Sequence, residues 1–213
     1  MKKLDIYLVD DHSLFREGLR FLLSGLDFVN GIFEAENGCQ LLEGLKNHPV
    51  DLVLLDIEMP KMNGIDTAHK VQEINPNIKI IALSMYSDEN YYTSMIEAGA
   101  DGFLLKNSSF SEVKKTILDV CQGKSYFSAK ILQSIVKKLY DKTTEDVSEK
   151  LTARETDVLR QICRGYSNPE IAEILSISKR TVDKHRENLL QKTYSKNTAS
   201  LVVYAIKHGY FEI

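Results

Sequence analysis

Five short apolar runs, each followed by a helical pattern, constrain the fold of this 213-residue chain more than any other feature. The runs cover residues 4–9, 31–35, 51–55, 78–83 and 101–105, and the helical patterns cover residues 13–25, 38–47, 64–75, 88–98 and 110–122. Such alternation is typical of buried strands in a parallel sheet that has helices on both faces. We therefore predict that residues 1–123 form an α/β doubly wound domain around a five-stranded parallel sheet.

Charged and hydroxyl side chains stand at the ends of four of these runs. Asp10 and Asp11 close the first run, Asp56 closes the third, Ser84 closes the fourth, and Lys106 follows the fifth. Because side chains just past the carboxyl ends of parallel strands gather in one crevice, we expect these five groups to lie together. Three carboxylates crowd together only around a cation, and oxygen ligands of this kind suit Mg²⁺, which also takes a phosphate. The crevice is predicted to be a phosphoryl-transfer site.

Each of these residues has a plainer interpretation when it is considered alone. Asp10 and Asp11 are suitable N-caps for the helix that is expected near residue 13, and Ser84 is a suitable cap for the helix that follows it. Lys106 alone would be an ordinary solvated lysine. Their joint occurrence at four strand ends favours the phosphoryl-transfer interpretation.

The second part of the chain is helical in pattern. Residues 124–150 are expected to be a linker, in which residues 129–140 carry an apolar helical stripe and residues 141–150 are polar and typical of a flexible tether. Residues 151–213 contain four short helical segments and are predicted to form a separate all-α domain.

Local signals mark the helices of this second domain. The first begins with a capping box at Thr152 and Glu155, and the second is expected to open at Asn168 with Pro169 in the first helical position. The third, residues 179–192, is basic and follows a tight turn. Two helices joined by a tight turn, the second of them basic, are typical of a helix-turn-helix.

Charge is distributed unevenly between the two parts. The chain carries a net charge of −3, and residues 151–213 hold ten Lys and Arg against seven Asp and Glu, or +3, which leaves −6 on residues 1–150. This difference suggests an anionic partner for the second domain, although a mixed solvated surface would also explain it.

Composition also excludes several classes of protein. No apolar run is long enough to span a bilayer, and Asp5 interrupts any signal-peptide core, so we expect a cytoplasmic protein without a membrane partner. The three cysteines are too few and too widely spaced for a metal pattern or a disulfide framework. We expect each of them to be a small buried side chain: Cys39, Cys121 and Cys163.

Taken together, these residues resemble a known family. Residues 1–123 resemble the receiver domain of two-component response regulators, through Asp10, Asp11, Asp56 followed by Met59, Pro60 and Gly64, then Ser84, and Lys106 after residues 102–105. Residues 151–213 resemble the LuxR-type helix-turn-helix, through residues 151–155, 167–172, 177–178, 181–182, His185 and Asn188. The combination is similar to the NarL/FixJ architecture, which implies a flavodoxin-like (CheY-like) receiver followed by a four-helix domain.

The resemblance implies the chemistry of the receiver site. In this family a sensor histidine kinase transfers a phosphoryl group to an aspartate, and the matching residue is Asp56, whose carboxylate would attack phosphorus. The implied ligands of Mg²⁺ (or Mn²⁺) are Asp10, Asp11, Asp56 and the backbone carbonyl of Glu58.

Three further residues are implied to bind and sense the phosphoryl group. Lys106 would pair with a phosphate oxygen, and Ser84 would donate its hydroxyl to the same group. Phe103 matches the aromatic switch position, at which the ring follows the Ser84 hydroxyl inward. Many relatives have tyrosine there, so the inward ring of Phe103 would have to be held by packing alone. An ordinary core phenylalanine is the alternative.

The third helix of the second domain is implied to read double-stranded DNA in the major groove. The residues expected to contact DNA are Lys179, Arg180, Thr181, Lys184, His185 and Arg186. His185 has the alternative role of ordering the helix. Two residues depart from the family pattern: Asp183 stands where many relatives have lysine, and could accept from a cytosine or repel wrong placements. Tyr194 stands where many have glycine, which argues against a glycine-type C-cap at the end of this helix.

The resemblance thus implies a transcriptional response regulator and not a turnover enzyme, although Asp56 would accept a phosphoryl group and could release it by autodephosphorylation. Phosphorylation would act through residues 84–105, release the second domain and favour a homodimer on promoter DNA. Three alternatives stay open: a constitutive DNA-binding regulator, a phosphatase with Asp56 as nucleophile and Glu58 as general acid, and an adaptor that binds another protein.

Overall fold

The structure, a computed structural model, describes residues 3–85, 89–124 and 151–211, with side chains described for all of these except residues 89–91. The chain divides into two compact units, Met1–Ile117 and Leu118–Ile213. The linker helix expected over residues 129–140 and the tether expected over residues 141–150 lie outside the described residues. Within the described segments, no helix combines the length and the apolar character that crossing a membrane requires.

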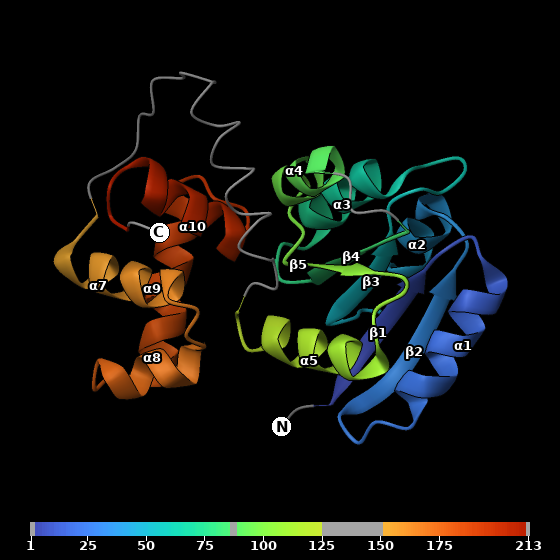
Figure 1. The fold of residues 1–213 in the computed structure, drawn as a ribbon, viewed down its shortest axis with the longest axis horizontal. Coiled ribbons are helices and arrows are strands. Elements are labelled where there is room, and N and C mark those ends of the chain that lie inside the picture. Colours follow the sequence, from blue (N-terminus) through green and yellow to red (C-terminus); the bar gives the residue numbers. More distant parts are fainter. Residues whose placement is uncertain (1–2, 86–88, 125–150, 212–213) are drawn as a thin grey trace. The chain divides into compact units, whose positions relative to one another are not determined.

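The first unit is built on a five-stranded parallel sheet with the strand order β2-β1-β3-β4-β5 (Figure 1). Its strands are β1 (Leu4–Val9), β2 (Val29–Ala35), β3 (Leu52–Asp56), β4 (Lys79–Ser84) and β5 (Gly102–Leu105). Its helices are α1 (Ser13–Ser24), α2 (Gly38–Gly44), α3 (Gly64–Ile74), α4 (Glu89–Ala98) and α5 (Phe110–Cys121). Helices α2, α3 and α4 cover one face of the sheet, and α1 and α5 cover the other (Figure 1). The predicted fold class and every predicted strand and helix of this unit are confirmed.

The strands are continuously apolar because helices cover both faces of the sheet. All residues of β3 are buried, and this central strand pairs with β1 (Ile6 opposite Leu52) and with β4 (Leu52 opposite Lys79). All strands run in the same direction, so their carboxyl ends reach one edge of the sheet. Asp56 is the last residue of β3 and Ser84 the last residue of β4, so both lie at that edge.

Local sequence signals set the ends of the helices. The side chain of Asn63 caps α3 by accepting a hydrogen bond from the backbone N–H of Asp66 at 2.8 Å. The same helix stops at Ile74, because Asn75 before Pro76 is extended (φ −155°). Gly99 follows α4 with φ +108°, in the left-handed region that glycine adopts without strain.

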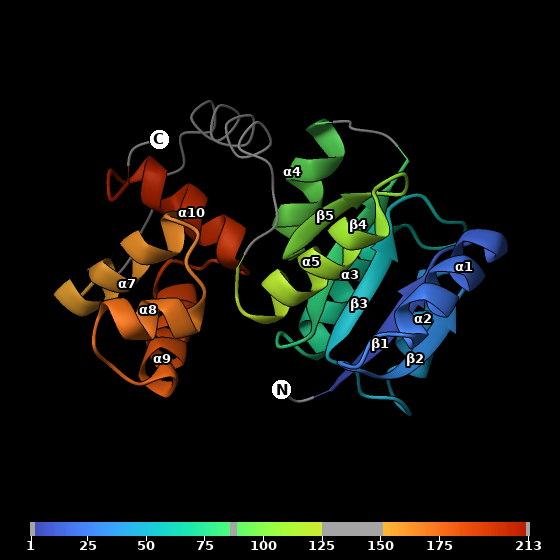
Figure 2. The same cartoon turned by 60° about the horizontal axis from the view of Figure 1, so that its bottom comes forward.

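The second unit contains four helices among its described residues: α7 (Ala153–Cys163), α8 (Asn168–Ile174), α9 (Lys179–Lys192) and α10 (Thr198–Lys207) (Figure 2). Their apolar faces form one core, in which Leu159, Ile171, Val182 and Leu189 are fully buried. The expected helix-turn-helix is present as α8, a short turn and α9.

Both expected helix starts of this unit are present, one of them with a shift. Thr152 and Glu155 form the capping box of α7. The second helix begins at Asn168, as expected, and Ser167 is its N-cap. The Glu170 carboxylate accepts from the Ser167 N–H at 2.7 Å and from its hydroxyl at 2.6 Å, so Pro169 is the second helical residue and not the first. Pro169 lies in the first turn, where its missing N–H has no cost.

Glu155 also connects the first helix of the unit to the third. Its carboxylate, which is 2% exposed, accepts from Lys192 Nζ at 2.9 Å. Burial alone would raise the pKa of Glu155, but the hydrogen bonds from Thr152 and Lys192 outweigh it, and the pKa lies below its ordinary value. Lys192, the last residue of α9, is therefore engaged within the domain.

The expectation that all three cysteines are buried is only partly met. Cys39 is exposed, because it lies in the first turn of α2 on the side away from the core. Cys121 and Cys163 are partly buried, and burial raises the pKa of the Cys163 thiol to about 12.

The end of α9 contradicts the expectation about Tyr194. This residue adopts a left-handed backbone (φ +52°), the conformation that a glycine would take there. The Ser195 N–H donates to the Leu190 carbonyl at 2.9 Å and the Tyr194 N–H to the Gln191 carbonyl at 3.2 Å, which is the Schellman pattern. The C-cap forms although the residue is unfavourable for it, because the hydrogen bonds of the helix end outweigh the strain of one side chain.

We expect Tyr194→Gly to stabilise the protein by about 1 kcal/mol, because glycine has no Cβ that would clash with the carbonyl in this backbone conformation. The Tyr194 side chain is 80% exposed, so its loss removes little packing. Urea unfolding curves measure the change. Tyr194→Ala is the matched control, since it removes the ring and keeps the Cβ; a gain for alanine equal to that for glycine would contradict the backbone explanation.

Candidate functional site

The strand ends bring a lysine and two carboxylates into one buried cluster. Lys106, which follows β5, places its Nζ 2.8 Å from Asp10 Oδ2 and 2.7 Å from Asp56 Oδ2. The three side chains are 4%, 2% and 3% exposed, in the same order. The contact to Asp56 is a hydrogen bond, and the contact to Asp10 Oδ2 is ionic without hydrogen-bond alignment. One ammonium thus lies against two buried carboxylates at the ends of different strands.

Burial and neighbouring charges set the protonation of this cluster. Burial raises the pKa of Asp56, and the negative charge of Asp10 raises it further. Hydrogen bonds from Lys106 and from the Glu58 N–H lower it, and the pKa of Asp56 lies at about 6. Burial would lower the pKa of the Lys106 ammonium, but the two carboxylates outweigh it and raise that pKa. Lys106 therefore stays charged, and burial makes ionisation of the Asp56 carboxyl unfavourable.

The chain beside Asp56 is held close to the strand end by a glycine. A Cβ on Gly64 would lie 2.2 Å from the Asp56 carbonyl oxygen and 2.7 Å from the Ile57 Cα, so no other residue fits without a shift. The Gly64 N–H donates to the Ile57 carbonyl at 2.8 Å. This close approach folds residues 58–63 back over the end of β3.

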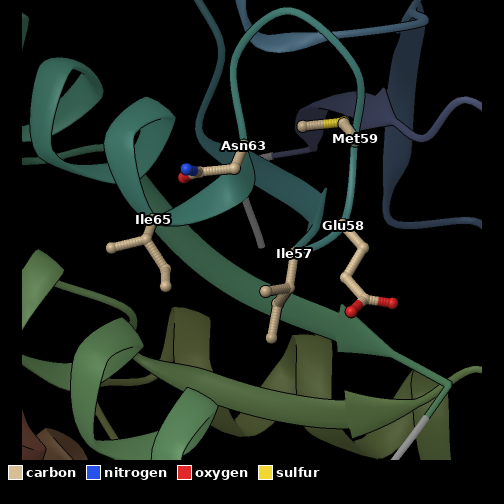
Figure 3. Close-up of a pocket in the computed structure, with 5 residues that line it drawn as sticks. All are labelled: Ile57, Glu58, Met59, Asn63 and Ile65. Atoms are coloured by element: carbon tan, nitrogen blue, oxygen red, sulfur yellow. The ribbon is translucent and has the colours of Figure 1, made fainter.

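An open pocket of about 420 Å³ lies beside this loop. It is lined by Ile57, Glu58, Met59, Asn63 and Ile65 (Figure 3). Figure 3 shows the two isoleucine side chains on one side of the loop with the Glu58 carboxylate beside them. Glu58 is exposed, and its backbone N–H donates to Asp56 Oδ1 over a long 3.4 Å. The exposed Glu58 carboxylate therefore lies beside this pocket, two residues after Asp56 in the chain.

Sequence reasoning missed one residue of the site. His12 directs its Nδ1 toward the acidic pair, 3.0 Å from Asp11 Oδ1 and 3.2 Å from Asp10 Oδ1. Ligand atoms of Asp10, Asp11, His12 and Asp56 all lie within 4.8 Å of one another. Its position directly after the acidic pair could have drawn attention to it.

The donor set fits a divalent cation. Three carboxylates and an imidazole are anionic or neutral donors in reach of one ion, and Lys106 alone leaves the cluster two positive charges short of its three acids. Asp11 is 35% exposed, so the cluster is open to solvent on the side from which an ion or a phosphate would enter.

The two residues expected to form a switch lie on neighbouring strands. Ser84 is buried at the end of β4, and its carbonyl accepts from the Lys106 N–H at 2.8 Å. Phe103, in β5, is buried and meets the Tyr92 ring of α4 edge to face, with centroids 4.1 Å apart. An aromatic pair therefore connects β5 to α4, and both strands lead into the acidic cluster.

The structure exposes four of the six residues expected to contact DNA. Lys179, Arg180, Thr181 and Lys184 are exposed in the first part of α9. Arg186 is 8% exposed and donates to the Thr198 hydroxyl of α10, and Nδ1 of His185 is buried without a hydrogen-bond partner. The helix turns these two side chains toward the domain interior.

Asp183 also has a different environment from the one that the sequence suggested. Its Oδ1 accepts from Asn168 Nδ2 at 2.6 Å, and its Oδ2 accepts from Lys179 Nζ at 3.0 Å. Both oxygens are thus used within the domain, where they connect α8 to α9 and partly neutralise one basic side chain. The same charge balance occurs at Lys184, whose Nζ lies 2.7 Å from Glu187 in an exposed pair.

Comparison with known proteins agrees with this geometry. Residues 6–118 match the response regulator receiver domain, and residues 149–205 match the luxR family of bacterial regulatory proteins. The transcriptional regulatory protein DegU of Brevibacillus brevis is 32% identical over 227 residues, which cover 99% of this chain and 96% of DegU. The transcriptional regulatory protein MctR of Rhizobium johnstonii is 35% identical over 207 residues, which cover 97% of this chain and 95% of MctR.

A solved structure of full length is also similar. The crystal structure of the response regulator ChrA of a heme-sensing two-component system has a TM-score of 0.52 and 26% identity, and the match covers 99% of this chain and 100% of ChrA. The acidic cluster lies within the matched receiver domain, and helices α8 and α9 lie within the matched luxR-family domain. The chain belongs to the LuxR-family response regulators, the two-component transcriptional regulators that join a receiver domain to a helix-turn-helix domain.

Proposed function

We propose that a sensor histidine kinase phosphorylates Asp56 and that this modification controls binding of the helix-turn-helix domain to promoter DNA. The observation that carries the proposal is the buried cluster in which Lys106 holds Asp56 and Asp10 at the strand ends. We assign the receiver to residues 1–123, the linker to residues 124–150 and the DNA-binding domain to residues 151–213. Because the proposed binding target is promoter DNA, we propose that the protein is cytoplasmic.

The proposed transfer uses the oxygen of the Asp56 carboxylate that Lys106 does not bind. Lys106 binds Oδ2, so Oδ1 attacks the phosphorus of a phosphohistidine on the kinase. A new O–P bond forms while the P–N bond breaks, and the imidazole nitrogen leaves with the bonding electrons. Lys106 stays within reach of the phosphoryl oxygens and the Ser84 hydroxyl lies on the neighbouring strand end, so both would bind the transferred group.

The metal that we propose for this site is Mg²⁺ (or Mn²⁺). Asp10, Asp11, Asp56 and the backbone carbonyl of Glu58 would hold it, in agreement with the donor set described above. When bound, it supplies positive charge that offsets the charge of the incoming phosphoryl group. We also propose autodephosphorylation, in which water attacks the phosphorus, the bond between phosphorus and the Asp56 oxygen breaks, and inorganic phosphate leaves. Glu58, exposed beside Asp56, affects the access of that water.

For the DNA-binding domain we propose a contact set of four residues: Lys179, Arg180, Thr181 and Lys184. His185 and Arg186 are assigned to the support of α9, because the described structure turns them inward. One such helix buries too little surface for specific binding, so a homodimer on two half-sites is proposed. A phosphatase function is not favoured, since it would leave the luxR-family domain unexplained.

We expect intact-mass spectrometry after treatment with acetyl phosphate and Mg²⁺ to show one added phosphoryl group on the wild type and none on Asp56→Asn. The reason is that an amide nitrogen does not replace the carboxylate as nucleophile. Glu58→Gln, which changes the exposed neighbour and leaves the backbone carbonyl, is the control and should still be phosphorylated. An adduct on Asp56→Asn, or one that peptide mapping places elsewhere, contradicts the proposal.

We expect Lys184→Ala to weaken binding to a promoter fragment by about tenfold and to lower the slope of log affinity against log salt by about 1, as for one lost phosphate contact. Glu187→Ala removes its exposed partner and should leave binding equal or tighter. Lys70→Ala removes the same charge from an exposed position of α3 and is the control. Fluorescence anisotropy at several salt concentrations measures these changes; equal losses for Lys70→Ala and Lys184→Ala are incompatible with α9 as the DNA-contacting helix.

We expect Phe103→Ala to abolish the gain in DNA affinity on phosphorylation while Asp56 remains phosphorylated, because the ring connects β5 to Tyr92 of α4. Phe103→Leu, which leaves a smaller cavity, is the second variant and should lose part of the gain. DNA titrations with and without acetyl phosphate, paired with mass spectrometry, give both readouts. The switch role is excluded if both variants keep the wild-type gain.

A further inference from the structure

His12 occupies a position for which its side chain is a poor choice in terms of local structure. It is the N-cap of α1, where Ser, Thr, Asp and Asn are preferred because their oxygens accept from free backbone N–H groups. The His12 side chain makes no such cap hydrogen bond. A residue that breaks a local rule beside a functional cluster points to a role in that cluster.

The ring is instead turned into the acidic site. Its Nδ1 lies 3.0 Å from Asp11 Oδ1 and 3.2 Å from Asp10 Oδ1, and 3.5 Å from Lys106 Nζ. The backbone of His12 is fixed in this place, because its N–H donates to Asp10 Oδ1 at 2.9 Å. A ring nitrogen of His12 is also one of four ligand atoms that lie within 4.8 Å of one another. A cation between the carboxylates would therefore have an imidazole nitrogen within reach.

Nitrogen and oxygen donors select different cations. Mg²⁺ takes oxygen ligands and retains water, whereas imidazole favours divalent ions of the first transition series. We propose that His12 Nδ1 is a ligand of the receiver metal site and that it makes this site prefer a first-row transition ion over Mg²⁺. This inference rests on the proposed function only in that the acidic cluster holds a divalent cation.

The ring has one other use that the geometry allows. With a proton on Nδ1, His12 would donate to the Asp10 and Asp11 carboxylates and only orient them. As a ligand, Nδ1 carries the lone pair and the proton sits on Nε2, which is compatible with the side chain being 63% exposed. An orienting ring would affect all cations alike, whereas a ligand would affect transition ions selectively.

Pulsed electron paramagnetic resonance on the Mn²⁺-loaded full chain tests the ligand directly. We expect modulation from a coordinated ¹⁴N nucleus in the wild type and its loss in His12→Asn. Asparagine is a better N-cap than histidine, so this variant should fold at least as well. His69→Asn removes an imidazole from α3, outside the cluster, and should keep the signal.

Calorimetric titration with Co²⁺ and with Mg²⁺ provides the second readout. We expect His12→Asn to lose about tenfold or more in Co²⁺ affinity and less than about threefold in Mg²⁺ affinity. Absence of ¹⁴N modulation in the wild type, its persistence in His12→Asn, or equal losses for both ions each overturn the proposal. If neither ion binds the wild type, both this proposal and the metal site of the proposed function are overturned. Phosphorylation of Asp56 is measured separately, by mass spectrometry.

Discussion

The interaction on which the receiver depends is the ion cluster of Lys106 with Asp10 and Asp56. Two carboxylates at a sheet edge with little exposure to water are unfavourable, and the ammonium that lies within 2.8 Å of both offsets this cost. Compensation is incomplete, since burial still raises the pKa of Asp56 to about 6. The site therefore attracts further positive charge. A group that changes the charge at Asp56 also changes the ion pairs that Lys106 forms with Asp56 and Asp10.

The cluster is coupled to the rest of the receiver through the backbone. The Lys106 N–H donates to the Ser84 carbonyl, and Ser84 ends the strand that pairs with β5, which carries Phe103. Phe103 in turn packs on Tyr92 of α4. A change in the bonds of Lys106 can thus reach α4 through two paired strands and one aromatic contact. This is a physical route from charge at Asp56 to a helix surface.

Most of the fold and half of the site follow from local sequence. The periodicity of apolar residues and the capping residues predict the strands and helices, because both signals depend on neighbours along the chain. The charged residues at the strand ends predict that Asp10, Asp56 and Lys106 lie together, because the strands are parallel. Arg186 was expected at the DNA surface, but a basic side chain in a basic helix does not reveal that Thr198 of another helix accepts its hydrogen bond. At Tyr194 the sequence argued against a left-handed C-cap, yet the hydrogen bonds at the end of α9 impose that backbone on an unfavourable residue.

Sequence alone determined the order of strands and helices, the two-domain organisation and which carboxyls gather at the strand ends, because these arise from apolar periodicity and from which residues end buried strands. Only the tertiary structure decided which charges remain available. Asp183 is held by Asn168 and partly neutralises Lys179, Lys192 is bound by Glu155, and the ring of His12 lies against Asp10 and Asp11. Pairing depends on distances across helices and strands that are remote in sequence, and no local pattern encodes those distances.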